Sequence, residues 1–321
     1  MKDKIKIVAI QVNQNLASRD TLFLKTGNLI KEAVKTGAEL IVFPELFSTG
    51  YIPNYNLWER ILVEGKHRLN WLKTTSKEYG VYIGMGHVEM INGEVFNTYV
   101  LSNPQGEIEG RSIKENGEAY IFKRGSGNHL IHSGLGLISV GICADNHSCN
   151  IIAQIQDEKP VLHLMPHAWA TPFGTNKMIK ESDFERIRKD LNDFPVTIAK
   201  ALGVPSVFVN QLGDMPQMKG ILGRLMSPKK FKLQGHSKII DSNGNILAEM
   251  KNEEGFILAE VELKTATRKN EIPNYNGWTH EGSKLLRKII IPLDLFFGKR
   301  KYEKKMRILR KDINEQSVRQ I

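Results

Sequence analysis

Two reactive side chains stand directly after runs of apolar, β-branched residues, at points where the sequence predicts strands to end. Glu45 follows the run Glu39–Phe43, and the thiol of Cys143 follows the run Leu137–Ile142. Active sites of open α/β folds gather at the carboxyl ends of strands, and an activated thiol is a strong nucleophile. Each residue also has a simpler interpretation, Glu45 as a solvated loop acid and Cys143 as a small buried hydrophobe.

Three motifs around these residues occur together and in a fixed order. They are Phe43–Tyr51, the segment Gly110–Lys114 with Glu118–Phe122 and Gly125 after it, and Gly141–Asp145. Weaker matches are Asn97, Pro166–Trp169, Asn210 and Gly235–Ser237. Through these motifs the sequence resembles the nitrilase superfamily of carbon–nitrogen hydrolases, from about Lys4 to Leu263.

The resemblance implies a catalytic set of side chains. Cys143 would attack the carbonyl carbon, and Glu45 would take the thiol proton. Lys114 and the backbone N–H of Ala144 would stabilise the negative charge on the carbonyl oxygen. Glu118 would hold Lys114 charged and oriented, or contact the substrate.

One departure from the family pattern affects this set. Only Glu115–Gly117 separates Lys114 from Glu118, whereas many family members place more residues in this gap. The short loop is expected either to open the pocket or to shift Lys114. Lys123 is the alternative ammonium group.

The residues after Cys143 allow further interpretations. Asp145 is expected to hold the turn or to cap the following helix. His147 is an alternative base in a Cys/His dyad, although a spacing of four residues after a strand does not bring its ring to the thiol. Cys143, His147 and Cys149 supply only three ligands for a metal, so neither a metal nor another cofactor is expected, and Cys149 is assigned to packing.

Several side chains near the motif ends are candidates to contact a substrate. They are Tyr51, Asn146, His147, His167 and Trp169. Trp169 is equally compatible with a place in the core. Together they predict a pocket with hydrogen-bonding capacity but do not identify a molecule.

The elements that must position these residues follow from hydrophobic periodicity. Strands are predicted at Lys4–Val12, Glu39–Phe43, Val81–Gly86, Phe96–Leu101, Leu137–Ile142, Val161–Met165, Val204–Asn210, Lys238–Ile240, Asn245–Ala248 and Phe256–Val261. Helices are predicted at Thr21–Lys35 and Asp190–Leu202, and the first strand–helix–strand unit predicts parallel pairing. Leu212–Lys232 is expected to be a mobile loop over a site or a long surface connection.

The resemblance implies more than these patterns do. The implied fold is α/β, a four-layer α-β-β-α sandwich whose dimers extend the layers. The expected division is a hydrolase domain at residues 1–265 and a basic C-terminal extension at residues 266–321. A homodimer or higher homo-oligomer is the expected assembly.

Composition favours a reducing, cytoplasmic setting. The chain has 321 residues and only two cysteines, with no signal-peptide pattern and no apolar run long enough for a membrane span. The formal net charge is +10, and residues 284–321 hold twelve Lys/Arg against four Asp/Glu. The rest of the chain is nearly neutral, which argues against a nucleic-acid partner.

The basic extension is predicted to be amphipathic. Pro292 is expected to break any single helix, and beyond it an apolar stripe recurs at helical spacing, at Tyr302, Met306, Leu309 and Ile313. Packing on the body or on a partner subunit is the favoured role. The alternative is contact of residues 284–321 with an anionic membrane surface.

The function expected from the resemblance is hydrolysis of a small linear amide or carbamoyl compound through a thioester on Cys143. Acyl transfer to an amine or alcohol and hydrolysis of a nitrile use the same residues. A non-catalytic binding protein on this fold is the alternative from another class. The presence of Glu45, Lys114, Glu118 and Cys143 argues against it.

Overall fold

Two six-stranded sheets face each other in the computed structural model, which describes residues 3–13, 19–52, 54–175 and 180–318. The first sheet has the order β15-β1-β2-β3-β4-β5. Its strands are β1 (Lys4–Gln11), β2 (Leu40–Val42), β3 (Tyr82–Ile91), β4 (Glu94–Ser102), β5 (Ile108–Ile113) and β15 (Gly255–Glu262). The predicted parallel pairing at the start is confirmed, because β2 lies parallel to both β1 and β3.

The second sheet has the order β14-β13-β10-β8-β7-β6. Its strands are β6 (Leu130–Ser133), β7 (Gly136–Val140), β8 (Leu162–His167), β10 (Ser206–Asn210), β13 (Lys238–Ile240) and β14 (Ile246–Glu249). The central strands β7, β8 and β10 run parallel, so their carboxyl ends meet at one edge. Cys143, which follows β7, is therefore placed at this edge, beside the segment Trp169–Ala170 that follows β8.

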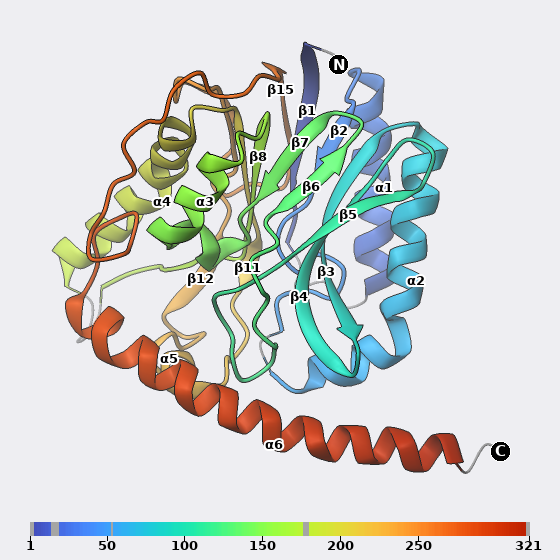
Figure 1. Cartoon of the computed structure of the whole chain (residues 1–321), viewed down its shortest axis with the longest axis vertical. Helices are drawn as coiled ribbons and strands as arrows, with labels where there is room; N and C mark the ends of the chain where they lie inside the picture. Colours follow the sequence, from blue (N-terminus) through green and yellow to red (C-terminus); the bar gives the residue numbers. More distant parts are fainter. Residues whose placement is uncertain (1–2, 14–18, 53, 176–179, 319–321) are drawn as a thin grey trace.

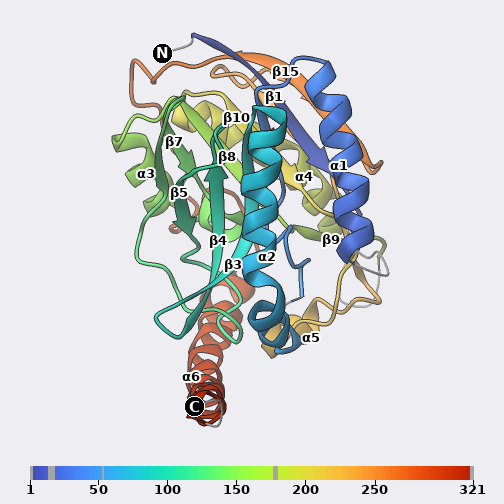
Figure 2. The same ribbon diagram turned by 90° about the vertical axis from the view of Figure 1, so that its right-hand side faces the viewer.

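Helices cover the outer face of each sheet. The helices α1 (Arg19–Lys35) and α2 (Asn56–Tyr79) pack on the first sheet, and α3 (Cys149–Asp157) and α4 (Glu181–Leu202) pack on the second. Figure 1 shows these pairs on opposite sides of the molecule, and Figure 2 shows α1 and α2 side by side. The predicted four-layer fold is confirmed.

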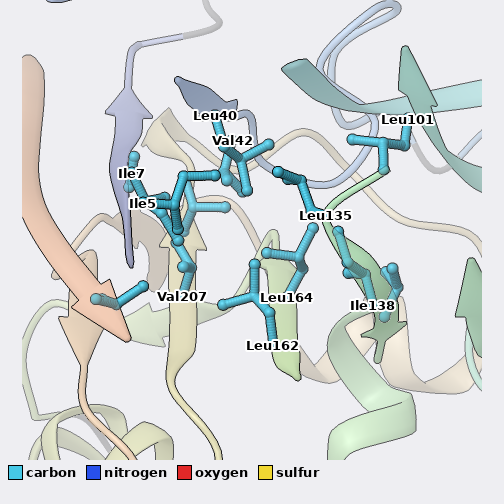
Figure 3. Close-up of a cluster of buried hydrophobic side chains, with 14 of the residues drawn as sticks. Ile5, Ile7, Leu40, Val42, Leu101, Leu135, Ile138, Leu162, Leu164 and Val207 are labelled. Carbon is cyan, nitrogen blue, oxygen red and sulfur yellow. The ribbon is translucent and has the colours of Figure 1, made fainter. Parts of the chain in front are cut away.

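Strand alternation explains why each sheet has two buried faces. Ile5 and Ile7 of β1 point into the core between the sheets, whereas Val8 and Ile10 pack toward the helices. Figure 3 shows the inter-sheet core, where Leu40, Val42 and Leu101 of the first sheet meet side chains of the second, among them Ile138, Leu162, Leu164 and Val207. Burial of each of these aliphatic side chains stabilises the folded state by roughly 1.5–3 kcal/mol relative to exposure.

The segment Leu212–Lys232 is more structured than predicted. It contains β11 (Leu212–Asp214) and α5 (Gly220–Leu225) and leads into β12 (Phe231–Gln234). Together with β9 (Ala170–Pro172), β11 and β12 form a small third sheet of three strands. The expectation of a plain surface connection is wrong, because ladder hydrogen bonds to β9 hold this segment against the residues after β8.

The later part of the C-terminal extension is one continuous helical run, after a non-helical stretch at residues 266–283. A π-helical turn, η2 (Leu286–Ile290), leads into α6 (Ile291–Val318). The predicted break at Pro292 is wrong, because the N–H of Ile291 bonds five residues back to Leu286. This wider turn carries the chain past a proline that has no N–H to donate. The predicted extension also includes residues 319–321, which lie outside the described residues, as does the side chain of Ile313.

The inner side of α6 packs on the body of the protein. Tyr302 and Met306 are buried in a cluster with Trp58 and Val95. The hydroxyl of Tyr302 accepts the N–H of Val95 at 2.9 Å and donates to Glu94 at 2.7 Å. None of the helices in the described ranges is long and apolar enough to cross a membrane.

Candidate active site

Glu45 lies in the loop after β2 and is completely buried. Its Oε1 accepts hydrogen bonds from Lys114 Nζ at 2.6 Å and Asn97 Nδ2 at 2.8 Å, and its Oε2 accepts the N–H of Ala168 at 2.9 Å. The loop rests on Gly86 of β3, where a Cβ would come within 2.3 Å of the backbone nitrogen of Leu46. Glu45 is therefore a fixed, desolvated carboxylate, and the interpretation as a solvated loop acid is wrong.

Lys114 bridges two carboxylates. Its Nζ lies 2.6 Å from Glu45 Oε1 and 3.0 Å from Glu118 Oε2, and Glu118 also accepts the hydroxyl of Tyr51 at 2.8 Å. Burial alone would lower the pKa of the Lys114 ammonium, but the charges of Glu118 and Glu45 raise it well above its ordinary value. Lys114 is therefore a permanent cation beside the thiol segment.

The short loop between Lys114 and Glu118 does not displace the lysine. Gly117 has a φ of +132°, and a Cβ at this position would lie 2.9 Å from Lys114 Nζ. Glycine therefore gives the lysine room to reach both carboxylates. The alternative ammonium, Lys123, lies elsewhere, paired with Glu303 at 2.8 Å.

Asp145 fixes the backbone of the same loop. Its carboxylate accepts the N–H of Asn116 at 2.8 Å and the N–H of Glu115 at 3.2 Å. Burial raises the pKa of Asp145 to about 6, although His129, Lys114 and these backbone hydrogen bonds oppose the shift. The predicted structural role of Asp145 is supported, but it holds the loop after Lys114 and does not cap the following helix.

Cys143 begins a short 3₁₀ turn, η1 (Cys143–His147), just beyond β7. Its φ of +48° is in the left-handed region, which costs a residue with a side chain about 1–3 kcal/mol. Burial and the neighbouring Glu45 raise the pKa of the Cys143 thiol well above its usual value, against the opposing charge of Lys114. The resting group is a thiol and needs a proton acceptor.

The turn at Cys143 is braced by Asn146. The Asn146 amide donates to the carbonyl of Gly141 at 2.5 Å, and its Oδ1 lies 2.9 Å from Nε2 of His163. A Cβ on Gly141 would come within 2.0 Å of Asn146 Oδ1, so only glycine fits there. Asn146 is fully buried and does not line the cavity, which corrects its prediction as a substrate contact.

Cys143 opens into a cavity of about 460 Å³. Of the predicted substrate contacts, Tyr51, His147 and Trp169 line it, as does Ala144. His167 does not line it, because its Nδ1 faces the carbonyl of Met165 at 3.0 Å and its ring packs 4.7 Å from that of Phe208. This position corrects the prediction of His167 as a substrate contact.

His147 has partners of its own. Its ring lies 4.4 Å from the ring of Phe194, and its Nδ1 lies 3.2 Å from Nδ1 of His280. Burial and the neighbouring His280 hold the pKa of His147 well below its usual value. Within the described parts of the chain, no hydrogen bond joins His147 to Cys143. Those contacts do not support the Cys/His dyad.

The sequence did not predict a metal site, and Cys149 was assigned to packing. The thiol of Cys149 faces the carbonyl of Pro273 at 3.2 Å, as expected for a packing residue. In the ranges that the structure describes, no three His, Cys, Asp or Glu side chains gather as metal ligands would.

Two further segments line the cavity, and sequence reasoning anticipated only the first of them as a possible cover. The segment predicted as a possible cover contributes Met215, Met218, Lys219, Leu222 and Met226. The stretch before and inside the C-terminal helix contributes Gly277, Trp278, His280, Leu286, Ile291, Asp294 and Leu295. The apolar spacing of the extension predicted an inward face, but no local signal connected that face to Cys143.

Three charged side chains line the cavity, and the two acids among them have hydrogen-bond partners. The three side chains are Glu118, Lys219 and Asp294. Glu118 binds Lys114, and Asp294 accepts the N–H groups of Ile221 and Leu222 at the start of α5, at 2.6 and 3.1 Å. The ammonium of Lys219 lies 5.7 Å from the centre of the Tyr55 ring. The remaining wall is mostly aliphatic, aromatic and thioether in character.

Comparison with known sequences finds one matching family and several relatives. The profile of the carbon–nitrogen hydrolase family matches residues 6–270. A 2-oxoglutaramate amidase of Bacillus subtilis is 28% identical over 261 residues, which cover 77% of this chain and 87% of that enzyme. An omega-amidase of Xenopus tropicalis is 25% identical, over 76% of this chain and 84% of that one.

Solved structures agree with the fold. A carbon–nitrogen hydrolase of Helicobacter pylori superposes with a TM-score of 0.70 at 18% identity and covers 81% of this chain and 89% of its own. An amidase from Nesterenkonia sp. superposes with a TM-score of 0.62 at 18% identity, with coverage of 82% and 92%. At these identities the likeness shows the same two-sheet fold with flanking helices.

Proposed function

Because the chain belongs to the carbon–nitrogen hydrolase family, we propose that it hydrolyses the C–N bond of a small carboxamide through a thioester on Cys143. One observation carries the proposal. The buried Lys114 ammonium lies 2.6 Å from Glu45 and 3.0 Å from Glu118. The thiol beside this cluster belongs to Cys143, the first residue of the 3₁₀ turn η1. A binding protein would gain nothing from three desolvated charges held against a strained cysteine.

The geometry supports a two-step reaction. Glu45 takes the thiol proton as Cys143 attacks the carbonyl carbon, and a C–S bond forms. Lys114 and the N–H of Ala144 stabilise the negative charge on the oxygen. The C–N bond then breaks, and Glu45 returns the proton to the departing amine.

Water completes the cycle. Glu45 takes a proton from a water molecule, which attacks the thioester and releases the acid. The Cys143 thiolate recovers its proton from Glu45, so atoms and charge balance over the cycle. The single carboxylate is proton acceptor and donor in turn, which fits a group whose pKa burial raises.

The lining favours an uncharged, apolar acyl group. Two acids, Glu118 and Asp294, stand in the lining against one exposed cation, Lys219, and most of the other lining residues are apolar, including Met218, Leu222 and Ile291. Burying a further carboxylate among these acids and apolar side chains would be costly. We therefore expect a preference that differs from 2-oxoglutaramate, the substrate that the Bacillus subtilis relative is named for. One solved structure of the Nesterenkonia amidase is a complex with butyramide, an amide of the class proposed here.

Acyl transfer is the second candidate. The apolar wall that covers the cavity is the observation that favours it, because a thioester shielded from water lasts long enough to meet an amine. Carbamoyl compounds and nitriles would need the same nucleophile and are further candidate substrates.

Intact-protein mass spectrometry tests the proposal. The wild type and Cys143→Ala are incubated with butyramide, longer alkyl amides, succinamic acid, a carbamoyl compound and a nitrile. We expect an acyl-sized adduct on the wild type alone that decays in water and forms faster with alkyl amides than with succinamic acid. An adduct that persists until an amine is added would favour transfer. The absence of any adduct, with slow alkylation of Cys143, would overturn catalysis.

A further inference from the structure

The C-terminal helical run has a second apolar face that no other element covers. Leu285, Ile289, Leu293, Phe296 and Phe297 each leave 43–59% of their surface exposed. Their spacing of four, four, three and one residues places them on one side of the run. The opposite side carries the buried Tyr302 and Met306. Figure 1 shows α6 along the lower edge of the molecule, with no element beneath it, and Figure 2 shows it projecting from the body.

This outward apolar face differs from ordinary surface apolar residues. Elsewhere the described chain exposes large apolar side chains singly or in pairs, such as Leu24 and the pair Ile246 and Leu247. Five exposed apolar side chains within thirteen residues of the helical run form a patch of the kind that marks an interaction site.

A basic stretch continues the outward face along α6. Lys299, Arg300, Lys304 and Arg307 are exposed and line a hollow beside Phe296. The guanidinium of Arg300 lies 4.5 Å over the Phe296 ring. Glu303, the acid among them, is paired with Lys123 at 2.8 Å. The partner of this face must therefore be apolar at one end and anionic at the other.

We propose that the outward face of residues 285–307 docks on an anionic lipid bilayer. A helix with exposed Leu, Ile and Phe flanked by Lys and Arg lies in the plane of the interface, with its apolar side chains among the upper acyl chains. The cations then meet the negative headgroups. The surplus of positive charge in residues 284–321, on a chain that is otherwise nearly neutral, supplies the attraction.

A second copy of the chain fits this face less well. Pairing the outward face with itself would cover the five apolar side chains but would leave Lys299, Arg300, Lys304 and Arg307 without an anionic partner. An anionic bilayer would contact both the apolar side chains and the cations. The same helix walls the cavity through Leu286, Ile291 and Leu295, so the docked surface and the catalytic cavity are two sides of one element.

Vesicle co-sedimentation of the full chain tests the proposal and does not depend on catalysis. The probes are vesicles of phosphatidylcholine alone and vesicles with phosphatidylglycerol added. We expect binding to the anionic vesicles at least about tenfold tighter than to the neutral ones, and weaker in high salt. Phe296→Ser with Phe297→Ser, and Lys299→Glu with Arg300→Glu, should each weaken it by at least about tenfold.

Matched controls change the same residue types elsewhere. Leu24→Ser alters an apolar side chain that is 72% exposed on α1, and Lys31→Glu with Lys35→Glu reverses two cations on that helix. These variants should bind like the wild type, and all variants should keep the wild-type circular dichroism. Equal loss in the controls would overturn docking through this face, as would failure of the wild type to bind anionic vesicles. A dimer in solution that Phe296→Ser with Phe297→Ser converts to a monomer, without vesicle binding, would assign the face to a second copy.

Discussion

The carboxylate of Asp145 accepts the backbone N–H of Asn116 at 2.8 Å, which ties the turn of the nucleophile to the loop of the lysine. Cys143 and Lys114 come from different sheets and are 29 positions apart in the chain. Asp145 thus links two elements that the fold alone brings near each other. We therefore expect the distance between the Cys143 thiol and the Lys114 ammonium to depend on this link.

Removal of the Asp145 link should impair catalysis more than folding. Asp145→Ala leaves the partly buried N–H groups of Glu115 and Asn116 without their acceptor, so the loop after Lys114 loses its anchor at a cost of about 1 kcal/mol for each hydrogen bond. We expect kcat/KM to fall about 10–100-fold. Asp145→Asn retains an oxygen for Asn116 and should recover part of the loss. Steady-state kinetics on the three proteins check this, and a wild-type kcat/KM in Asp145→Ala would refute the link.

Asp145 should also make stability depend on pH. Its pKa of about 6 in the folded protein exceeds the ordinary value of 3.8, so the folded state binds its proton more tightly than the unfolded state does. The resulting stabilisation is complete below about pH 4 and is lost as the pH rises through about 6. Relative to Asp145→Asn, the wild type should lose about 3 kcal/mol of unfolding free energy across this window.

Urea denaturation at several pH values measures this difference. Asp145→Asn is the reference for the wild type, because the two proteins share all other titrating groups. A gap between the two proteins that stays constant from pH 4 to pH 7 would show that Asp145 does not hold its proton in the folded state.

Glu45→Gln should abolish most proton transfer while it preserves the shape of the site. We expect kcat to fall by about 10²–10⁴. Burial raises the pKa of Glu45 above 4.5, against the opposing charge of Lys114, so wild-type activity should fall on the acid side as this carboxyl gains its proton. That acid limb should be absent from the variant's profile. Glu260→Gln removes an acid on β15 that lies 3.5 Å from Lys4, and it should leave both rate and profile unchanged.

Gly298 tests the contact between α6 and the catalytic loop. A Cβ there would lie 2.9 Å from the Cβ of Ala119, next to Glu118. We expect Gly298→Ala to push the helix outward, to cost about 1–3 kcal/mol and to raise KM for alkyl amides. Gly27 of α1 is the matched control, since nothing lies within 4 Å of a Cβ at that position. Gly27→Ala should stabilise the protein by about 0.4–1 kcal/mol, because alanine restricts the unfolded chain. Thermal denaturation and steady-state kinetics measure both variants.

Local patterns predicted the parts of the fold that local forces determine. The strand at β1 and the helix at α1 were predicted almost to the residue, because alternation and helical spacing are read directly from apolar positions. Helix α2 was not predicted. Gly65 and a run of polar residues weaken its intrinsic propensity, and burial of Leu57, Trp58, Ile61 and Leu72 holds it instead.

Proline misled the prediction in two places. Strand β8 continues through Pro166 to His167, and the helical run continues through Pro292 after the π turn. Helix α4 was predicted to contain Pro195, as it does, but it begins nine residues earlier than predicted, at Glu181.

The candidate site, like the fold, was predicted only in part. The residues named by the motifs, Glu45, Lys114, Glu118 and Cys143, come together as expected. The substrate contacts were harder to predict, because exposure to a cavity depends on rotamer and neighbours. Asn146 and His167 are as polar as Tyr51, yet neither lines the cavity. Asn146 makes internal hydrogen bonds to Gly141 and His163, and the ring of His167 packs against Phe208.

The profile match ends at residue 270, but Trp278, Leu286, Ile291 and Leu295 of the cavity wall lie after it. Part of the cavity wall is therefore encoded outside the stretch that carries Glu45, Lys114 and Cys143. Under the proposed function, exchange of the terminal helix alone would alter this part of the wall and leave the three reactive side chains in place. This modularity makes the last 40 or so residues the natural starting point for engineering selectivity.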